Sequence, residues 1–213
     1  MTQFNIEIVS DTVCPWCYVG KQKLEQAIKA YKELHPNSND TFSTTWMPFY
    51  LNPDAPKIGK FGEERSELMF ERLSAIGKDA GIAFKFGGRT GNTRDSHRLI
   101  QLGKSKSPAI QTRVVEELFA AYFENEGDIT SHETLKNAGI KAGLEEKEVI
   151  KWLESDEGGP AVDKEVEAAS RNQISGVPNY TIQGKYVVGG AQDPGVFLRL
   201  FEKIKAAEKG AKA

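Results

Sequence analysis

Cysteine and histidine are scarce in this 213-residue chain, which contains two cysteines and three histidines. A structural zinc site needs about four such ligands. Cys14 and Cys17 form the only Cys-x-x-Cys pair, and His35, His97 and His132 share no ligand spacing. The sequence therefore argues against a structural zinc centre. Two interpretations of the cysteines stay open, a redox pair or two inert thiols of the core, and the spacing favours the redox pair.

The chain also lacks a strong excess of one charge and any long hydrophobic run. Its 28 Lys and Arg against 30 Asp and Glu give a formal net charge of −2, which argues against a general nucleic-acid binder. No apolar stretch approaches membrane-spanning length, and the N-terminus has neither the basic start nor the apolar run of a signal peptide. We therefore expect a folded cytoplasmic protein, monomer or homodimer, with no nucleic-acid or membrane partner.

The two cysteines lie between a predicted strand and a predicted helix. Residues 4–9 alternate apolar and polar side chains, and residues 15–34 carry apolar side chains at helical spacing. Pro15 suits the first position of that helix. Cys14 then stands at the helix N-terminus, where free N–H groups and the helix dipole favour its thiolate. Since the thiolate is the form that attacks disulfides, the pattern is typical of a reactive site.

Two Pro- and Gly-rich boundaries, at residues 52–56 and 155–160, divide the rest of the chain. Before the first boundary, residues 42–50 predict a second strand, parallel to the first. Between the boundaries the pattern is helical, with no convincing strand pair and one extended segment at 81–88. A helix, a β-hairpin and a last helix follow. We expect helices at 63–79, 95–104, 108–125, 132–142, 145–154 and 161–172, hairpin strands at 179–182 and 185–188, and the last helix after Pro194.

This order of elements resembles the thioredoxin superfamily, and its long helical insertion resembles the DsbA branch. Within that branch, four segments resemble the FrnE-like subgroup, and they occur in the same order along nearly the whole chain: residues 10–20, 92–99, 176–178 and 190–192. The resemblance implies an α/β, thioredoxin-like fold with a large α-helical insertion. The thioredoxin-like domain is expected to comprise residues 1–52 and 158–213, with the inserted helical domain at 53–157.

The subgroup is related to 2-hydroxychromene-2-carboxylate isomerases and kappa-class glutathione transferases, which typically carry serine where Cys14 stands here. Because this chain keeps both cysteines, we expect thiol–disulfide exchange with protein thiols or glutathione. Cys14 is the expected nucleophile and Cys17 the resolving thiol. A glutathione-dependent isomerase or transferase is the first alternative, and a binding module or chaperone is the second. We expect no cofactor beyond the redox-active pair, with glutathione as a candidate co-substrate.

Two groups of residues are the expected substrate contacts. Pro15 and Trp16 separate the cysteines and tune the stability of the Cys14 thiolate, and Trp16 either packs internally or offers an apolar face to a substrate. The resemblance implies a cis bond between Val177 and Pro178. That bond makes a rigid turn opposite Cys14 and leaves the Val177 backbone free to pair with an extended substrate.

Four polar residues have both a functional and a structural interpretation. Asp11 is either a proton acceptor for the thiols or a turn-forming side chain. Asn92 either lines the cleft or caps a helix, and His97 fits a structural histidine better than an acid–base group. Asp193 resembles in position an acidic residue that holds glutathione in kappa-class enzymes, and a helix N-cap explains it equally well.

Three segments that are distant in the sequence are expected to form one cleft: the turn at Cys14, the Val177–Pro178 loop and the helix start at Asn92. The first two belong to the end of the sheet where parallel strand–helix units place ligands. Because Cys14 stands at the helix N-terminus with partial exposure, it should be the more acidic and the more accessible thiol.

Overall fold

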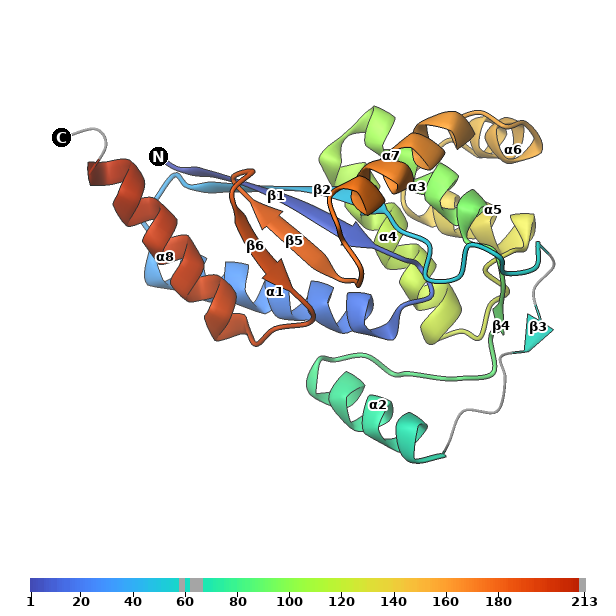
Figure 1. The fold of residues 1–213 in the computed structure, drawn as a ribbon, viewed down its shortest axis with the longest axis horizontal. Coiled ribbons are helices and arrows are strands. Elements are labelled where there is room, and N and C mark those ends of the chain that lie inside the picture. Colours follow the sequence, from blue (N-terminus) through green and yellow to red (C-terminus); the bar gives the residue numbers. More distant parts are fainter. Residues whose placement is uncertain (58–59, 62–66, 211–213) are drawn as a thin grey trace.

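The computed structural model describes residues 1–57, 60–61 and 67–210. A four-stranded sheet in the order β2-β1-β5-β6 forms its centre, as Figure 1 shows. Strand β2 runs parallel to β1, β5 runs antiparallel to β1, and β6 runs antiparallel to β5. The parallel crossover from β1 to β2 and the β5–β6 hairpin therefore agree with the sequence prediction. The strands comprise β1 (Gln3–Ser10), β2 (Thr41–Pro48), β5 (Asn179–Ile182) and β6 (Tyr186–Gly189).

Helices α1 (Pro15–Leu34) and α8 (Pro194–Gly210) pack against each other beside this sheet. Phe4 of β1 is fully buried between them, with ring contacts to Tyr31 of α1 and Phe201 of α8. Alternation along β1 sends such apolar side chains toward the two helices. These contacts complete the thioredoxin-like half of the molecule.

A buried polar group, here called the Asp40 cluster, closes the C-terminal end of α1. Asp40 accepts hydrogen bonds from the Thr2 amide at 2.7 Å, the Tyr31 hydroxyl at 2.8 Å and the Lys205 ammonium at 2.6 Å. Burial acts to raise the pKa of Asp40, but these hydrogen bonds, Lys205 first, hold it well below its ordinary value. The four residues tie the N-terminus, α1 and α8 together.

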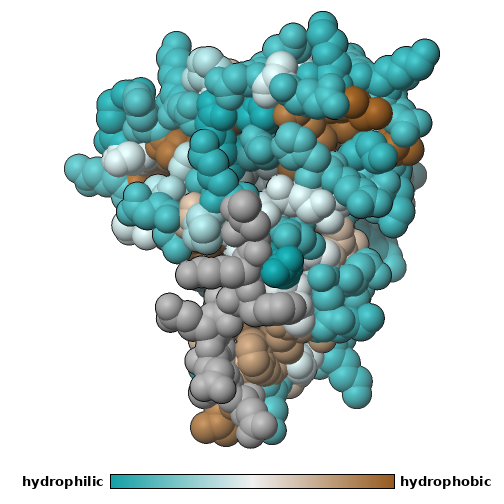
Figure 2. Space-filling view, turned by 90° about the vertical axis from the view of Figure 1, so that its right-hand side faces the viewer, coloured by the Kyte–Doolittle hydropathy of each residue, from teal (hydrophilic) through white to brown (hydrophobic). Residues whose placement is uncertain are grey.

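Helices α3 to α7 gather at the other end of the sheet, whereas α2 lies apart from them and contacts α1 (Figure 1). Helices α3 and α4 pack against β2, and α7 packs against α3 and β2. The outward surface of this end is mostly hydrophilic with a few separate hydrophobic patches (Figure 2). No helix in the described ranges is long and apolar enough to span a membrane. The helices comprise α2 (Glu67–Asp79), α3 (Arg94–Lys106), α4 (Pro108–Phe123), α5 (His132–Lys141), α6 (Glu146–Glu154) and α7 (Gly159–Arg171).

One sequence prediction for the insertion is wrong. Strand β3 (Lys60–Phe61) pairs antiparallel with β4 (Arg89–Thr90) to form a second, small sheet. Strands of two residues are too short to show an alternating pattern, so periodicity could not reveal them. Among the described residues, the insertion adds no strand to the central sheet. The predicted helix start at 63–66 lies outside the described residues, and the proposed boundaries at 52 and 158 stay a prediction.

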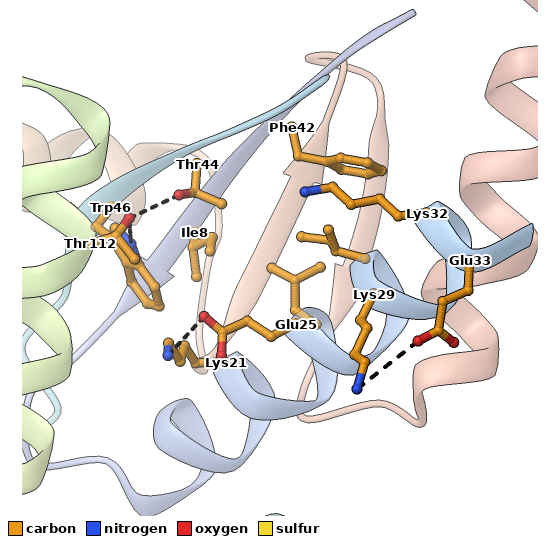
Figure 3. A pocket seen from close by; sticks show the side chains of 12 residues that line it. Ile8, Lys21, Glu25, Lys29, Lys32, Glu33, Phe42, Thr44, Trp46 and Thr112 are labelled. Atoms are coloured by element: carbon orange, nitrogen blue, oxygen red, sulfur yellow. Dashed lines mark hydrogen bonds and ion pairs between the residues drawn. The ribbon is translucent and has the colours of Figure 1, made fainter. Parts of the chain in front are cut away.

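Strand β2 is an edge strand of the sheet. The side chain of Gln111 in α4 makes the backbone hydrogen bonds to β2 that a further strand would make. The Gln111 amide donates to the Trp46 carbonyl at 2.9 Å and accepts from the Trp46 amide at 3.1 Å. Next to this contact, α1 and β2 border a groove of about 600 Å³ with Leu24 and Phe42 in its walls (Figure 3). Neither cysteine lines this groove.

Candidate active site

The turn from β1 into α1 places the two cysteines. Cys14 is the N-cap residue of α1, Pro15 begins the helix, and the Cys17 amide donates to the Cys14 carbonyl at 3.0 Å. The loop before β5 approaches from the other side, and the Val177–Pro178 peptide bond is cis. The Cys14 thiol lies 3.7 Å from the Val177 carbonyl oxygen. The thiol turn and the proline loop therefore face each other, as the resemblance implies.

Both thiols are buried. Cys14 is 4% exposed and Cys17 is 1% exposed. The prediction that Cys14 is partly exposed is therefore wrong, because the loop carrying Val177 lies over a thiol that an isolated helix N-terminus would leave open. Trp16 is the surface residue of the motif, with 38% of its area exposed.

The two thiols differ in acidity. The hydrogen bond from Cys17 is the largest influence on Cys14, and it lowers the pKa of the Cys14 thiol despite burial. Burial is the largest influence on Cys17, and together with the interaction with Cys14 it raises the pKa of the Cys17 thiol well above its ordinary value. Cys14 is thus the group that ionises first, in agreement with the roles expected for a nucleophile and a resolving thiol.

Asp11 and His97 form a buried pair behind the thiol turn. One Asp11 oxygen accepts the Leu51 amide at 2.8 Å, and the other lies 3.3 Å from Nε2 of His97. The same nitrogen lies 3.1 Å from the Phe49 carbonyl oxygen. His97 therefore bridges the turn and the segment after β2. The Asp11 charge is close enough to act on Cys14, and it raises the pKa of that thiol.

The start of α3 is attached to the thiol turn. The hydroxyl groups of Thr12 and Ser96 lie 2.7 Å apart, and both residues are buried. Asn92 lies just ahead of α3, where its side-chain oxygen accepts the Arg94 amide at 2.9 Å. Asn92 therefore supports the first turn of α3, although the N-cap residue itself is Thr93. A hollow of about 70 Å³ separates this segment from the thiol turn.

Asp193 and the proline loop lie at the other border of the site. The Asp193 carboxylate accepts the Gly195 amide at 3.2 Å and so satisfies the first turn of α8. Beside Val177 and Pro178 lies a hollow of about 740 Å³, bordered by the end of α7 and by the β5–β6 hairpin. Space for a substrate is thus present next to the loop that contacts Cys14.

Two residues near the thiols were missed by the sequence analysis. Tyr180 is fully buried on β5, and its hydroxyl has no hydrogen-bond partner within the described part of the chain. Gly20 is the point of α1 on which this hydroxyl and Pro178 pack. The strand pattern could have identified Tyr180, because position 180 shares the inward face of β5 with Ile182 and Tyr brings a polar group there.

The family model for DSBA-like thioredoxin domains matches residues 5–202. The chain belongs to this family. The DsbA-like chain is 27% identical over 203 residues to the uncharacterised protein YwbO of Bacillus subtilis, covering 91% of this chain and 93% of YwbO. It superimposes on a probable DsbA oxidoreductase from Streptomyces coelicolor with a TM-score of 0.81 and 26% identity, covering 94% of this chain and 89% of that one.

Two more distant structures share the fold of the DsbA-like chain. A 2-hydroxychromene-2-carboxylate isomerase gives a TM-score of 0.68 at 17% identity, covering 98% of both chains. The cytosolic disulfide reductase DsbM from Pseudomonas aeruginosa, solved with GSH, gives 0.63 at 14% identity, covering 95% of this chain and 99% of DsbM. The thioredoxin-like fold with a helical insertion is therefore confirmed. The described residues contain no cluster of three potential metal ligands.

Proposed function

We propose that this chain is a thiol–disulfide oxidoreductase in which Cys14 and Cys17 cycle between dithiol and disulfide. The observation that carries the proposal is the geometry of the pair: Cys14 is the N-cap residue of α1, the Cys17 amide donates to its carbonyl at 3.0 Å, and its thiol lies 3.7 Å from the carbonyl oxygen that precedes a cis-proline. The lowered pKa of Cys14 and the raised pKa of Cys17 agree with this arrangement. An attacking thiol that ionises easily, beside a second thiol that stays protonated until needed, suits two-step exchange.

In the reducing direction, the Cys14 thiolate attacks one sulfur of a substrate disulfide. A Cys14–substrate mixed disulfide forms, and the first substrate thiolate leaves. Cys17 then loses its proton, and its sulfur attacks Cys14. The Cys14–Cys17 bond forms as the second substrate thiolate leaves, so two electrons pass from the protein to the substrate. The oxidising direction is the reverse.

Substrate recognition follows from what borders the thiols. Val177 offers its backbone to an extended substrate, and the exposed Trp16 ring offers an apolar surface. Because Cys14 is 4% exposed, a substrate sulfur reaches it only as the proline loop yields. A small thiol such as glutathione and a flexible peptide both meet this condition, and we propose them as substrates in the cytoplasm.

A glutathione-dependent isomerase or transferase is the second candidate, because an isomerase shares the fold over nearly the whole chain. In such an enzyme Cys14 takes the place of serine, and Cys17 plays no part in the reaction. Asn92 and Asp193 would then hold the polar ends of glutathione. In the structure their side-chain oxygens accept backbone amides at the starts of α3 and α8. Binding of glutathione by these two residues is therefore a separate hypothesis that needs its own test.

Reaction of the reduced protein with glutathione disulfide separates these candidates. The wild type should release two glutathione molecules and end with a Cys14–Cys17 disulfide. Cys17→Ser should stop at a mixed disulfide of Cys14 with glutathione, and Cys14→Ser should not react. Mass spectrometry identifies each product. A Cys17→Ser protein that retains full isomerase or transferase activity, with a wild type that forms no internal disulfide, would contradict the oxidoreductase proposal.

A further inference from the structure

The hollow beside the proline loop has a border without charge. Its volume is about 740 Å³, which lies within the range of about 300–1,000 Å³ typical of ligand pockets. Among the twelve described residues that border it, none is acidic or basic. Because charged residues make up 27% of the chain, an uncharged border of this size sets the hollow apart from the rest of the surface.

The hollow is continuous with the reactive thiol. Val177 borders it, and the carbonyl oxygen of the same residue lies 3.7 Å from the Cys14 sulfur. An extended chain advances about 3.3 Å per residue. A substrate that pairs with the Val177 backbone and brings its cysteine to Cys14 therefore reaches the hollow with the residues beside that cysteine.

One wall of the hollow is the open face of the β5–β6 hairpin. Asn179 and Thr181 point to the face opposite the buried Tyr180, because side chains alternate along a strand. Both are half-buried, and neither side chain has a hydrogen-bond partner within the described part of the chain. Val187, paired with Thr181 in the sheet, is 66% exposed and adds an apolar surface. This wall offers uncharged polar and apolar groups to a peptide.

The opposite wall is the C-terminal end of α7. Residues 172–175 follow the helix and border the hollow. The negative end of the helix dipole lies here, and it disfavours anions near the last turn. Arg171, in that turn, does not border the hollow, and its side chain is 64% exposed and pairs with Glu167 at 3.4 Å. A carboxylate in the hollow would thus meet the unfavourable end of a helix and no cation in the described border.

We propose that this hollow binds the residues beside the cysteine of an extended polypeptide substrate and discriminates against acidic ones. The proposal rests on the oxidoreductase function and names the substrate class of that site, polypeptides with uncharged or basic residues next to the exchanging cysteine. The Cys14 thiolate attacks the sulfur of that cysteine, the substrate S–S bond breaks, and the second thiolate leaves with the electron pair. Occupation of the hollow holds the attacked sulfur at Cys14.

The test uses the reduced protein and blocked peptides of one length, each with a single cysteine held as a mixed disulfide with 2-thiopyridine. Attack by Cys14 on the peptide sulfur releases pyridine-2-thione, whose absorbance gives the rate. Three peptides carry serine, lysine or glutamate on both sides of the cysteine and serine elsewhere. A fourth carries the same glutamates at its two ends, far from the cysteine. The rate of each peptide with dithiothreitol corrects for its intrinsic reactivity.

After this correction, the peptide with glutamate beside the cysteine should react about fivefold more slowly than the serine peptide. A helix end changes an equilibrium by about two- to fivefold for each charge close to it. The lysine peptide should react at least as fast as the serine peptide. The peptide with terminal glutamates has the same net charge as the slow peptide and should match the serine peptide, because its charges lie outside the hollow.

Val187→Lys adds a cation to the border of the hollow at a residue that is already exposed. It should raise the ratio of the glutamate-peptide rate to the serine-peptide rate by about threefold, as expected for one exposed ion pair. Leu34→Lys is the matched control. Leu34 is 63% exposed and ends α1 at the end opposite Cys14, so this variant should keep the wild-type ratio.

Each contrary result has one meaning. Equal rates for the serine peptide and the peptide with glutamate beside the cysteine, while the wild type forms its Cys14–Cys17 disulfide, overturn this proposal and leave the oxidoreductase proposal intact. A lysine peptide or a terminal-glutamate peptide as slow as that glutamate peptide, or equal ratios in Val187→Lys and Leu34→Lys, also overturns it. A wild type that reacts with none of the peptides, or forms no Cys14–Cys17 disulfide, refutes the oxidoreductase proposal itself.

Discussion

The two ends of helix α1 carry buried polar groups in opposite states. At the C-terminal end, the Asp40 cluster satisfies its members: one carboxylate accepts from Thr2, Tyr31 and Lys205. At the N-terminal end, Cys14, Cys17 and the Tyr180 hydroxyl are equally buried, and the hydroxyl has no partner in the described residues. Buried polar groups that satisfy one another contribute stability, whereas an unpaired buried hydroxyl is costly to the fold.

The largest effect that this comparison predicts is loss of stability at the Asp40 cluster. Asp40→Asn removes the charge that faces Lys205, whose ammonium then lies 14% exposed without an ion-pair partner. We expect the free energy of unfolding to fall by about 2–3 kcal/mol, measured by urea denaturation. The rates at which Cys14 and then Cys17 of the reduced protein react with an added disulfide such as dithiobis(nitrobenzoate) should both be unchanged. A change in either rate would show that the two ends of α1 are not independent.

The same cluster predicts a pH dependence with a definite sign. Because the folded state lowers the pKa of Asp40, this contribution to stability is complete above the pKa of an unfolded aspartate, about 3.9. It is lost as the pH falls through that value toward the folded pKa. Asp40→Asn should therefore show a weaker loss of stability in acid than the wild type. Equal acid sensitivity of both proteins would contradict the assignment.

A moderate effect on stability is expected at Gly20, in the part of α1 that follows the two cysteines. In Gly20→Ala the new methyl group meets the Tyr180 hydroxyl and Pro178, and overpacking of this kind costs about 1–3 kcal/mol. The higher helix propensity of alanine offsets about 1 kcal/mol of that cost. We expect a net loss of about 1 kcal/mol in urea denaturation and altered reactivity of Cys14, because the proline loop must shift.

Gly189→Ala is the control for this substitution, since nothing lies within 4 Å of a Cβ atom at that position. It should change neither stability nor thiol reactivity. If Gly20→Ala behaved like Gly189→Ala, the proline loop would not be packed on α1 as tightly as the structure shows.

The smallest effect concerns the charge of Asp11. That charge raises the pKa of Cys14, so Asp11→Asn should move the pH profile of Cys14 alkylation to lower pH. Ultraviolet absorption of the thiolate measures the same change directly. Asp128→Asn, in the connection between α4 and α5, removes an equal charge and should leave the profile unchanged. A profile that moved to higher pH in Asp11→Asn would exclude repulsion between Asp11 and the Cys14 thiolate.

Local patterns predicted most of the fold. The 3.6-residue and two-residue periodicities identified α1, β1 and the β5–β6 hairpin, because each element buries one face of its own sequence. The place of Cys14 at the N-terminus of α1 also predicted that the Cys14 thiol is more acidic than the Cys17 thiol. The burial of Cys14 could not be predicted in this way, since the covering residue, Val177, is 163 positions away.

The polar residues around the site show the same limit. Asp11 and His97 were both identified as candidates, and their contact, across 86 positions, depends on how α3 docks on the thiol turn. The sequence identified Tyr180 only as a residue of a strand. That its hydroxyl has no hydrogen-bond partner among the described residues can be seen only from the positions of all its neighbours in the structure.

Gln111 has a consequence for how the chain is made. An open edge strand is a template for strands of other molecules, and the amide that closes β2 at Trp46 comes 65 residues later in the sequence. At about 5–20 residues per second, the ribosome needs about 3 to 13 s to deliver it. During that interval the nascent β2 strand is open to association with other chains, and the arrival of α4 ends the exposure.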